Sequence, residues 1–271
     1  MSEASLPQSP LIGPASRVAL FDFDGTLSLI RTGWQSIMIP MMVEVLFECG
    51  TGEDIEQVRS AVREKVFQLT GKDTIYQMEE LHQQVLARGG EPLPPLTYKS
   101  EYLRRLRHAI ADRVEGLRRG TIDPDALLVP GARAFLEALQ KQELRLYLAS
   151  GTDHADVLEE ARLLRIDGFF GDSIFGARDD YSFSKALLVR RILASSERAP
   201  AKLIGFGDGF VEIEEVKKAG GVAVGIATFE PECIEIDAWK QRRLTLAGAD
   251  YILPNFLCQP LLLSIVSESR A

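Results

Sequence analysis

A ten-residue stretch sets the architecture of this 271-residue chain: Val18-Ala19-Leu20-Phe21-Asp22-Phe23-Asp24-Gly25-Thr26-Leu27. An apolar run bounded by glycine is typical of a buried β-strand, and the alternation of side chains along a strand places Asp22 and Asp24 on the same side. Two buried carboxylates this close repel each other unless a cation or a shared proton compensates them. The stretch therefore predicts a metal-assisted catalytic site at the end of a strand.

The bulk composition is that of an ordinary globular protein, with 46% hydrophobic and 26% charged residues. The chain is long enough for one large domain or for a core that carries an insertion. Its formal net charge of -8 disfavours nonspecific binding to nucleic acid or to an anionic membrane surface. No apolar run approaches the roughly 18 residues that a membrane span needs, so we expect neither nucleic acid nor membrane as a partner.

The cysteines and the N-terminal residues bear on the cellular compartment. Cys49, Cys233 and Cys258 lie far apart without a CxxC pair, which argues against a zinc cluster and a disulfide framework. Residues 1–14 are rich in Ser and Pro and lack the basic start and apolar centre of a signal peptide. We therefore expect a cytoplasmic protein whose first fourteen residues form a disordered lead-in.

Residues 30–125 show helical periodicity without a convincing strand signal. Apolar residues recur at helical spacing in four runs, which begin at Ile37, Ile55, Ile75 and Tyr102. The last run continues on one face as far as Val114 and predicts a single helix. Breaks occur at residues 71–74 and 89–95. The segment is thus predicted to be an all-helical insertion that forms a cap domain.

From residue 127 onward strands and helices alternate, which is the pattern of a parallel sheet covered by helices. Further strands are expected at residues 144–149, 174–175, 202–206, 222–226 and 251–253. The fold class is therefore α/β, with a Rossmann-like core formed by residues 15–29 and 126–271 and the helical cap inserted at 30–125. The charged residues between 230 and 243 are interpreted as a solvated face.

Polar side chains follow the ends of several of these strands. Asp22 with Asp24, Ser150 and Asp208 each come at or just after such an end, where ligands bind in open α/β sheets. Lys185 begins a helix near the same edge, although a cation at a helix N-terminus is unfavourable unless an anion lies nearby. Carboxylates, a hydroxyl and a lysine in this arrangement suit metal-assisted phosphoryl transfer.

These stretches resemble the four motifs of the haloacid dehalogenase-like hydrolase superfamily, in its phosphatase branch with a helical cap of the first type. The first motif, DxDxT, is Asp22-Phe23-Asp24-Gly25-Thr26. The second, a hydrophobic strand that ends in Ser or Thr, is Leu146-Tyr147-Leu148-Ala149-Ser150. The third-motif lysine matches Lys185, and the fourth motif, GDxxxD, matches Gly207-Asp208-Gly209-Phe210-Val211-Glu212, with Glu in place of the final Asp.

The resemblance implies catalytic roles for the two acids of the first motif. Asp22 would attack phosphorus and form an aspartyl-phosphate, while Asp24 protonates the leaving oxygen and then activates water. It also implies a phosphate site formed by Ser150, Gly151, Lys185 and Thr26.

The resemblance further implies Mg²⁺, which prefers oxygen ligands. Its expected ligands are Asp22, the backbone carbonyl of Asp24, and Asp208. Glu212, one methylene longer than the usual aspartate, is expected to act from further away.

The cap is expected to read the leaving group of a small phosphorylated metabolite, such as a phosphosugar or a phosphoglycolate-like compound. Lys72, in the loop at residues 71–74, is the candidate for specificity, and an ordinary loop role for it stays open. A P-loop is rejected because Val66 occupies the position of the upstream glycine.

Two alternatives remain, a phosphosugar mutase and a binding module without turnover. Dehalogenation is disfavoured because that branch lacks the second acid that is present here as Asp24. The protein is expected to be a monomer or a homodimer.

Overall fold

The computed structural model describes residues 17–179, 183–194 and 202–268. The predicted lead-in at residues 1–14 lies outside the described residues. Within the described part, no helix has the length and apolar character needed to cross a membrane.

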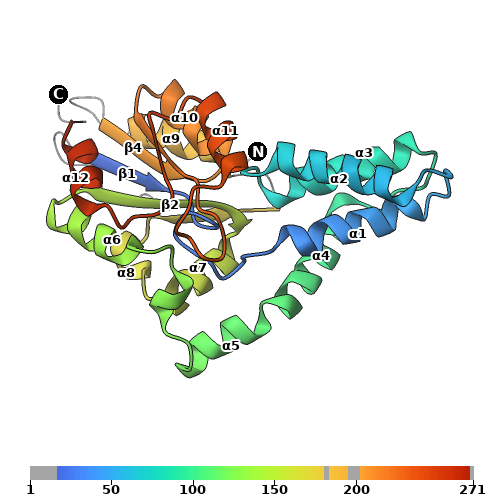
Figure 1. Ribbon diagram of the computed structural model, residues 1–271, viewed down its shortest axis with the longest axis horizontal. Coiled ribbons are helices and arrows are strands. Elements are labelled where there is room, and N and C mark those ends of the chain that lie inside the picture. The colour runs from blue at the N-terminus through green and yellow to red at the C-terminus, as the bar shows by residue number, and fades with distance from the viewer. Residues whose placement is uncertain (1–16, 180–182, 195–201, 269–271) are drawn as a thin grey trace, which may run out of the picture.

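A six-stranded parallel sheet forms the centre of the molecule, with the strand order β3-β2-β1-β4-β5-β6 (Figure 1). The predicted α/β fold is thereby confirmed. The strands are β1 (Arg17–Phe21), β2 (Arg145–Asp153), β3 (Ile174–Ala177), β4 (Lys202–Gly207), β5 (Val222–Ile226) and β6 (Tyr251–Leu253). The opening stretch thus supplies β1, which lies in the middle of the sheet between β2 and β4.

Helices cover both faces of the sheet, and the alternation along β1 shows how the layers are divided. Ala19 and Phe21 pack into the larger core, whereas Val18 and Leu20 pack into a second core on the opposite face. The first face carries α6 (Ala132–Lys141), α7 (His154–Leu163), α8 (Asp167–Phe170) and α12 (Gln259–Glu268); the second carries α9 (Lys185–Ala194), α10 (Phe210–Lys218) and α11 (Ala238–Leu246). A 3₁₀ turn, Pro124–Leu127, leads the chain into α6.

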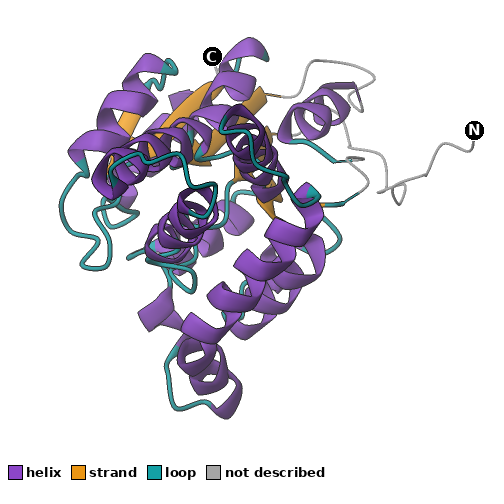
Figure 2. Cartoon of the chain, turned by 90° about the vertical axis from the view of Figure 1, so that its right-hand side faces the viewer, coloured by secondary structure: helices purple, strands orange, loops and turns teal. Residues whose placement is uncertain are grey.

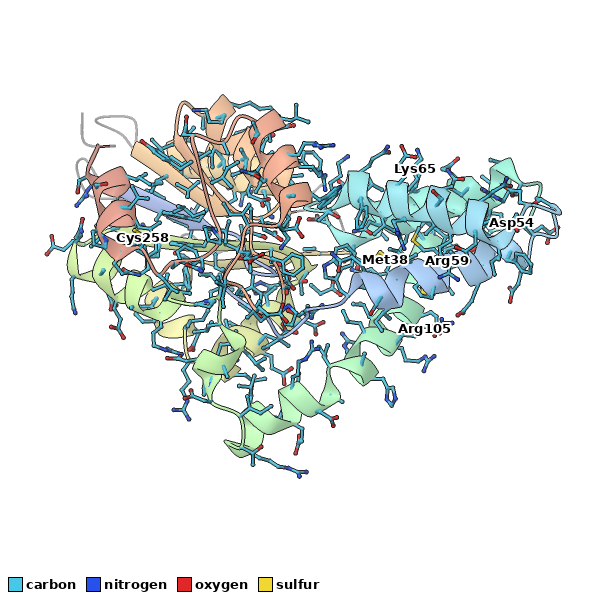
Figure 3. All side chains as sticks on the ribbon, viewed as in Figure 1. Met38, Asp54, Arg59, Lys65, Arg105 and Cys258 are labelled. Carbon is cyan, nitrogen blue, oxygen red and sulfur yellow. The ribbon has the colours of Figure 1, made fainter. Side chains whose placement is uncertain are left out.

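The cap consists of the helices that lie between β1 and α6 in the chain, and it projects from the sheet (Figure 1). Figure 2 views the molecule from the cap side and shows these helices in front of the strands. They are α1 (Gln35–Phe47), α2 (Ile55–Leu69), α3 (Thr74–Ala87), α4 (Pro95–Ala109) and α5 (Ala111–Arg119). Met38 is buried inside the cap, whereas Lys65 of α2 is partly exposed on its outer side (Figure 3).

The prediction of one helix from Tyr102 to Val114 is wrong, because the structure has two helices here. Ile110 separates α4 from α5 with φ -96° and ψ 2°, outside the helical region. The break lets α4 pack on α1 and α3 while α5 turns toward α7 of the core. Ile110 stays buried at the junction, so the apolar spacing continues through a bend that periodicity alone does not reveal.

Aromatic rings hold the larger core together beneath the end of β1. Phe21 stacks on Phe206 with ring centroids 4.7 Å apart, and Phe135 of α6 meets the Phe206 ring edge-on at 5.2 Å. Phe135 also stacks on Phe256 at 5.4 Å, and all four side chains are fully or almost fully buried. The cluster fixes the strand ends that carry the polar residues described below.

Replacing Phe135 by Ala should lower the free energy of unfolding by about 3–5 kcal/mol, because it opens a cavity among three other rings. Urea denaturation measures the change. Phe47→Ala is the matched control, since that ring is 52% exposed at the end of α1 and should cost far less. Equal losses in the free energy of unfolding for the two variants would show that the aromatic cluster does not stabilise the core.

Candidate active site

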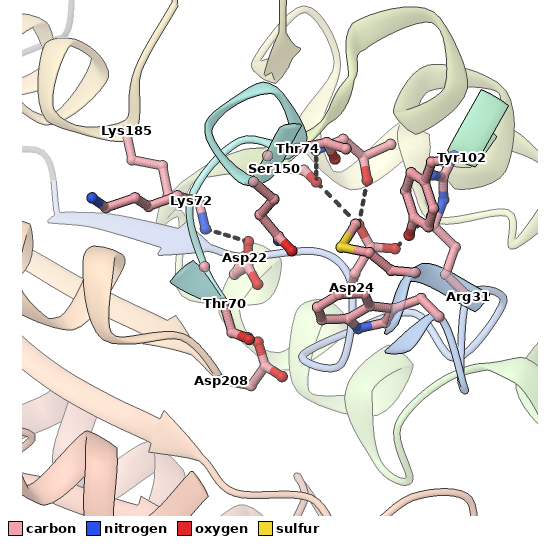
Figure 4. Close-up of a pocket in the computed structure, with 16 residues that line it drawn as sticks. Asp22, Asp24, Arg31, Thr70, Lys72, Thr74, Tyr102, Ser150, Lys185 and Asp208 are labelled. Carbon is pink, nitrogen blue, oxygen red and sulfur yellow. Dashed lines mark hydrogen bonds and ion pairs between the residues drawn. The ribbon is translucent and has the colours of Figure 1, made fainter. Parts of the chain in front are cut away.

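The predicted residues Asp22, Ser150, Lys185 and Asp208 converge at one edge of the sheet (Figure 4). Asp22 directly follows β1, and Asp208 directly follows β4. Ser150 lies in the last part of β2, and Lys185 is the first residue of α9. The four residues come from separate parts of the chain and line one cavity.

Lys185 forms a buried ion-pair cluster with two carboxylates. Its Nζ lies 2.6 Å from Oδ1 of Asp22 and 2.8 Å from Oε2 of Glu212, and the three side chains are 3%, 8% and 2% exposed. The two anions explain why a cation begins this helix, which Ser184 caps by accepting the N–H of Leu187 at 3.2 Å. Burial raises the pKa of Asp22, whereas Lys185 opposes that rise.

The two oxygens of Asp24 have different surroundings. Oδ2 accepts hydrogen bonds from the Ser150 hydroxyl at 3.2 Å and from the Thr152 hydroxyl at 2.8 Å. Oδ1 has no hydrogen-bond partner among the described residues and lies 3.8 Å from Nε of Arg31. Burial raises the pKa of Asp24, and the charge of Arg31 opposes this rise. Asp24 can therefore hold a proton more readily than an exposed aspartate.

The remaining predicted phosphate-site residues lie at different depths. Gly151 lines the cavity, whereas Thr26 is fully buried beneath it and donates its hydroxyl to Oδ2 of Asp22 at 3.5 Å. The Ser150 hydroxyl donates to Asp24 and accepts the N–H of Thr152 at 3.0 Å. In this arrangement Thr26 and Ser150 both contact the paired acids.

Three carboxylates offer a site for a cation. One oxygen each from Asp22, Asp208 and Glu212 lies within 4.8 Å of the others. Glu212 is also engaged elsewhere, because Oε1 accepts the N–H of Gly209 at the start of α10 and Oε2 pairs with Lys185. An all-oxygen donor set of this kind fits a hard divalent ion such as Mg²⁺.

The prediction of a solvated face between residues 230 and 243 is wrong at Lys240. This side chain is buried, with Nζ 2.9 Å from Oδ2 of Asp208 and 2.9 Å from Oε1 of Glu230. Lys240 is one helical turn before Leu244, which is fully buried on α11, and this spacing is the sequence signal for an inward-facing lysine. Lys240 and Glu230 therefore join the site through the Asp208 carboxylate.

Arg31 is a second residue that the sequence analysis did not find. Its guanidinium contacts Glu160 through Nε at 3.0 Å and through Nη2 at 2.7 Å, and it reaches Asp156 at 3.0 Å. Both acids belong to α7, so Arg31 ties the segment after β1 to the core helix beside Asp24. Its one sequence signal is a charge directly after the apolar pair Leu29 and Ile30.

The loop between α2 and α3 reaches the site, as predicted, and it does so through its backbone. A Cβ at Gly71 would lie 3.2 Å from Cα of Gly209, and a Cβ at Gly151 would lie 3.0 Å from the carbonyl oxygen of Lys72. Lys72 lines the cavity, but its side chain is exposed and its Nζ lies 5.9 Å from the ring centroid of Tyr76. The cap thus closes over the site with little space between the two backbones.

The cavity between cap and core has a volume of about 90 Å³. A single water needs roughly 10–15 Å³ measured in this way, so several waters or one small ligand can occupy it. The core side of the wall is acidic and hydroxylated, whereas the cap side is lined by Trp34, Met38, Thr70, Thr74, Gln77 and Tyr102. The arrangement therefore has a charged end near Asp22 and a largely uncharged end under the cap.

The chain belongs to the haloacid dehalogenase-like hydrolase family, whose model matches residues 17–220. The predicted family and the predicted hydrolase class are thereby confirmed. A search of curated proteins finds no match.

Solved structures with the same fold include three bacterial proteins of low sequence identity. A predicted phosphoglycolate phosphatase from Haemophilus somnus is 15% identical with a TM-score of 0.58, over 92% of this chain and 98% of that chain. A haloacid dehalogenase-like protein of unknown function from Agrobacterium tumefaciens is 15% identical with a TM-score of 0.57, over 93% and 99%. CbbY from Rhodobacter sphaeroides, in complex with xylulose-(1,5)bisphosphate, is 18% identical with a TM-score of 0.54, over 89% and 95%.

Replacing Arg31 by Met should lower the free energy of unfolding by about 3–5 kcal/mol, because Asp24, Asp156 and Glu160 lose their shared buried cation. Chemical denaturation measures the change. Arg105→Met is the control, since Arg105 pairs with Glu44 and Glu101 on the outer surface of the cap and should cost about 1 kcal/mol or less (Figure 3). A loss at Arg31 no larger than that at Arg105 would contradict the role of the network.

Proposed function

We propose that this protein is a Mg²⁺-dependent phosphatase that hydrolyses a small phosphorylated metabolite through an aspartyl-phosphate. The proposal rests on one observation, that two neighbouring acids make different contacts. Asp22 is held by a lysine at 2.6 Å, while Asp24 keeps one oxygen, Oδ1, without a hydrogen-bond partner among the described residues. An ion pair that favours the ionised carboxylate suits a nucleophile, and an oxygen without a hydrogen-bond partner suits a group that gives and takes a proton.

In the first step a carboxylate oxygen of Asp22 forms a bond to phosphorus as the bond to the leaving oxygen breaks. Asp24 delivers a proton to that oxygen, and Oδ1 is the atom from which it departs, because Oδ2 already accepts two hydroxyl hydrogen bonds. In the second step Asp24 takes a proton from water as the water oxygen bonds to phosphorus and the bond from the Asp22 oxygen to phosphorus breaks. Phosphate leaves and both carboxylates return to their starting states.

Charge neutralisation supports both steps. Lys185, the first residue of α9, neutralises charge on the Asp22 carboxylate and on the phosphoryl oxygens. When substrate binds, the Ser150 hydroxyl turns from Asp24 to a phosphoryl oxygen, to which the N–H of Gly151 also donates. Thr26 orients the Asp22 carboxylate from below.

Asp22, the backbone carbonyl of Asp24, and Asp208 would hold Mg²⁺, with Glu212 behind them. When bound, the ion supplies positive charge that stabilises the transferring phosphoryl group. Lys72 stays our candidate for a contact at the mouth of the cavity.

Product analysis distinguishes the phosphatase from the two alternatives, a phosphosugar mutase and a binding module. A phosphosugar mutase would use the same residues and return the phosphoryl group to the sugar without stoichiometric phosphate release. A binding module would hold the ligand without turnover. The cytoplasmic location and a monomeric or homodimeric state also stay predictions.

Asp22→Asn should lower phosphate release from an aryl phosphate by about 10³-fold or more, because an amide cannot act as the nucleophile. The measurement is inorganic phosphate released by metal-loaded protein, with circular dichroism to show that the fold is kept. Asp172→Asn is the control, since Asp172 is exposed in the loop before β3. Turnover retained by Asp22→Asn would exclude this nucleophile, and no release by the wild type from a broad panel would exclude the phosphatase.

Chelation of divalent ions should abolish turnover, and added Mg²⁺ should restore it. Asp208→Asn should raise the Mg²⁺ concentration for half-maximal activity about tenfold or more, because one charged oxygen ligand is lost. Isothermal titration calorimetry measures Mg²⁺ binding directly, again with Asp172→Asn as the control. Full activity in the presence of excess chelator would overturn the metal assignment.

A further inference from the structure

Gln77 is a buried polar residue that the catalytic steps do not use. It lies in the first half of α3, its side chain is 4% exposed, and it lines the cavity. Its amide oxygen Oε1 has no hydrogen-bond partner within residues 17–179, 183–194 and 202–268. Buried polar atoms are almost always paired, so this oxygen lacks a donor, and a ligand in the cavity that Gln77 lines is placed to supply one.

Apart from Lys72 at its exposed edge, the cap side of the cavity wall, to which Gln77 belongs, is uncharged and partly aromatic. Trp34 lies just before α1, Met38 lies in that helix, and Tyr102 lies in α4, so three cap segments meet around this end of the cavity. Met38 and Tyr102 are 1% and 4% exposed, and Trp34 is partly buried. Such a wall accepts the C–H face of a small ligand, while Gln77 is positioned to accept a hydrogen bond from one of its hydroxyls.

The cations that line the cavity are already committed or lie at its exposed edge. Lys185 is shared by Asp22 and Glu212. Arg31 is shared by three carboxylates, with Glu160 at 2.7 Å, Asp156 at 3.0 Å and Asp24 at 3.8 Å. Lys72 is exposed beside the Tyr76 ring.

A second anion held deep under the cap, away from Lys72 at the mouth, would therefore be buried without a counter-charge of its own. Burying an unpaired charge is strongly unfavourable. The cap end of the cavity thus discriminates against a leaving group that carries a carboxylate or a further phosphate.

We propose that Gln77 is a specificity-determining residue, and that the cap end of the cavity selects phosphomonoesters whose leaving group is an uncharged, hydroxylated alcohol. This inference rests on the proposed phosphatase function and extends it to the substrate class. Gln77 accepts a hydrogen bond from a hydroxyl of the leaving group, and Trp34 and Tyr102 cover the carbon face of the leaving group. Arg31 keeps its ion pairs with Asp24, Asp156 and Glu160.

Three small phosphomonoesters test separately the effect of the hydroxyls and the effect of a second charge on the leaving group. Glycerol 3-phosphate has an uncharged hydroxylated leaving group, propyl phosphate lacks the hydroxyls, and 3-phosphoglycerate carries a carboxylate. For the wild-type enzyme with Mg²⁺, kcat/KM should be at least tenfold higher for glycerol 3-phosphate than for 3-phosphoglycerate. Equal or greater activity on 3-phosphoglycerate would overturn the proposed charge selection.

The Gln77→Leu variant tests the residue itself. It should lower kcat/KM for glycerol 3-phosphate about tenfold, because the hydroxyl loses its acceptor, and should change kcat/KM for propyl phosphate less than twofold. Gln83→Leu is the matched control, since it removes an exposed amide from the same helix and should leave both values unchanged. Equal losses on both substrates would assign Gln77 a structural role, and no loss on either would exclude its contact with the ligand.

Calorimetry with the same three compounds separates this inference from the proposed function. Release of phosphate by the wild type from the broad panel but not from glycerol 3-phosphate overturns the inference alone. If the wild type releases no phosphate from these compounds or from the broad panel, the phosphatase proposal fails. Binding to the Mg²⁺-loaded protein then decides the inference alone, with glycerol 3-phosphate expected to bind tightest and Gln77→Leu to remove its advantage over propyl phosphate. Binding that does not depend on the hydroxyls would overturn the inference.

Discussion

The buried ion pair between Lys185 and Asp22 is the constraint on which the site depends. It joins the end of β1 to the start of α9, and the same ammonium reaches Glu212 of α10. Three segments that are distant in sequence are thus held at the sheet edge by one cation. Taking these charges out of water is costly, and the cost is offset only while all three groups are present together. Buried clusters of this kind are typical of functional sites.

The two halves of the cavity are built by different means. The core half consists of loops at strand ends, where hydrogen bonds from Ser150 and Thr152 orient Asp24. The cap half consists of helix faces, where packing positions Trp34 and Tyr102. Arg31 lies at the boundary, because it follows β1 in the chain and binds two acids of α7. This boundary couples the segment that leads into the cap to Asp24.

Much of the fold and of the core half could be predicted from local sequence. The period of two in β1 and the motif residues Asp22, Asp24 and Asp208 have strong local signals, and the strands at residues 222–226 and 251–253 match the expected bounds. The spacing of Lys240 before Leu244 indicates that Lys240 faces inward, but the partners of Arg31 and Lys240 lie far away in the chain and do not follow from local spacing. The environment of Gln77 arises only when the cap folds back onto the core.

The contact between the cap loop and the core has a consequence for how the family could diversify. Gly71 lies against Gly209, and the loop backbone lies against Gly151, so the closure at these points uses main chain and no large side chains. The seal over the reacting atoms is therefore separate from the side chains that face the ligand. Amino-acid substitutions on the inner surfaces of α1, α3 and α4 can change which ligand binds. The closure of the cap and the reacting residues stay the same. Selectivity and turnover can thus be modified independently in this architecture.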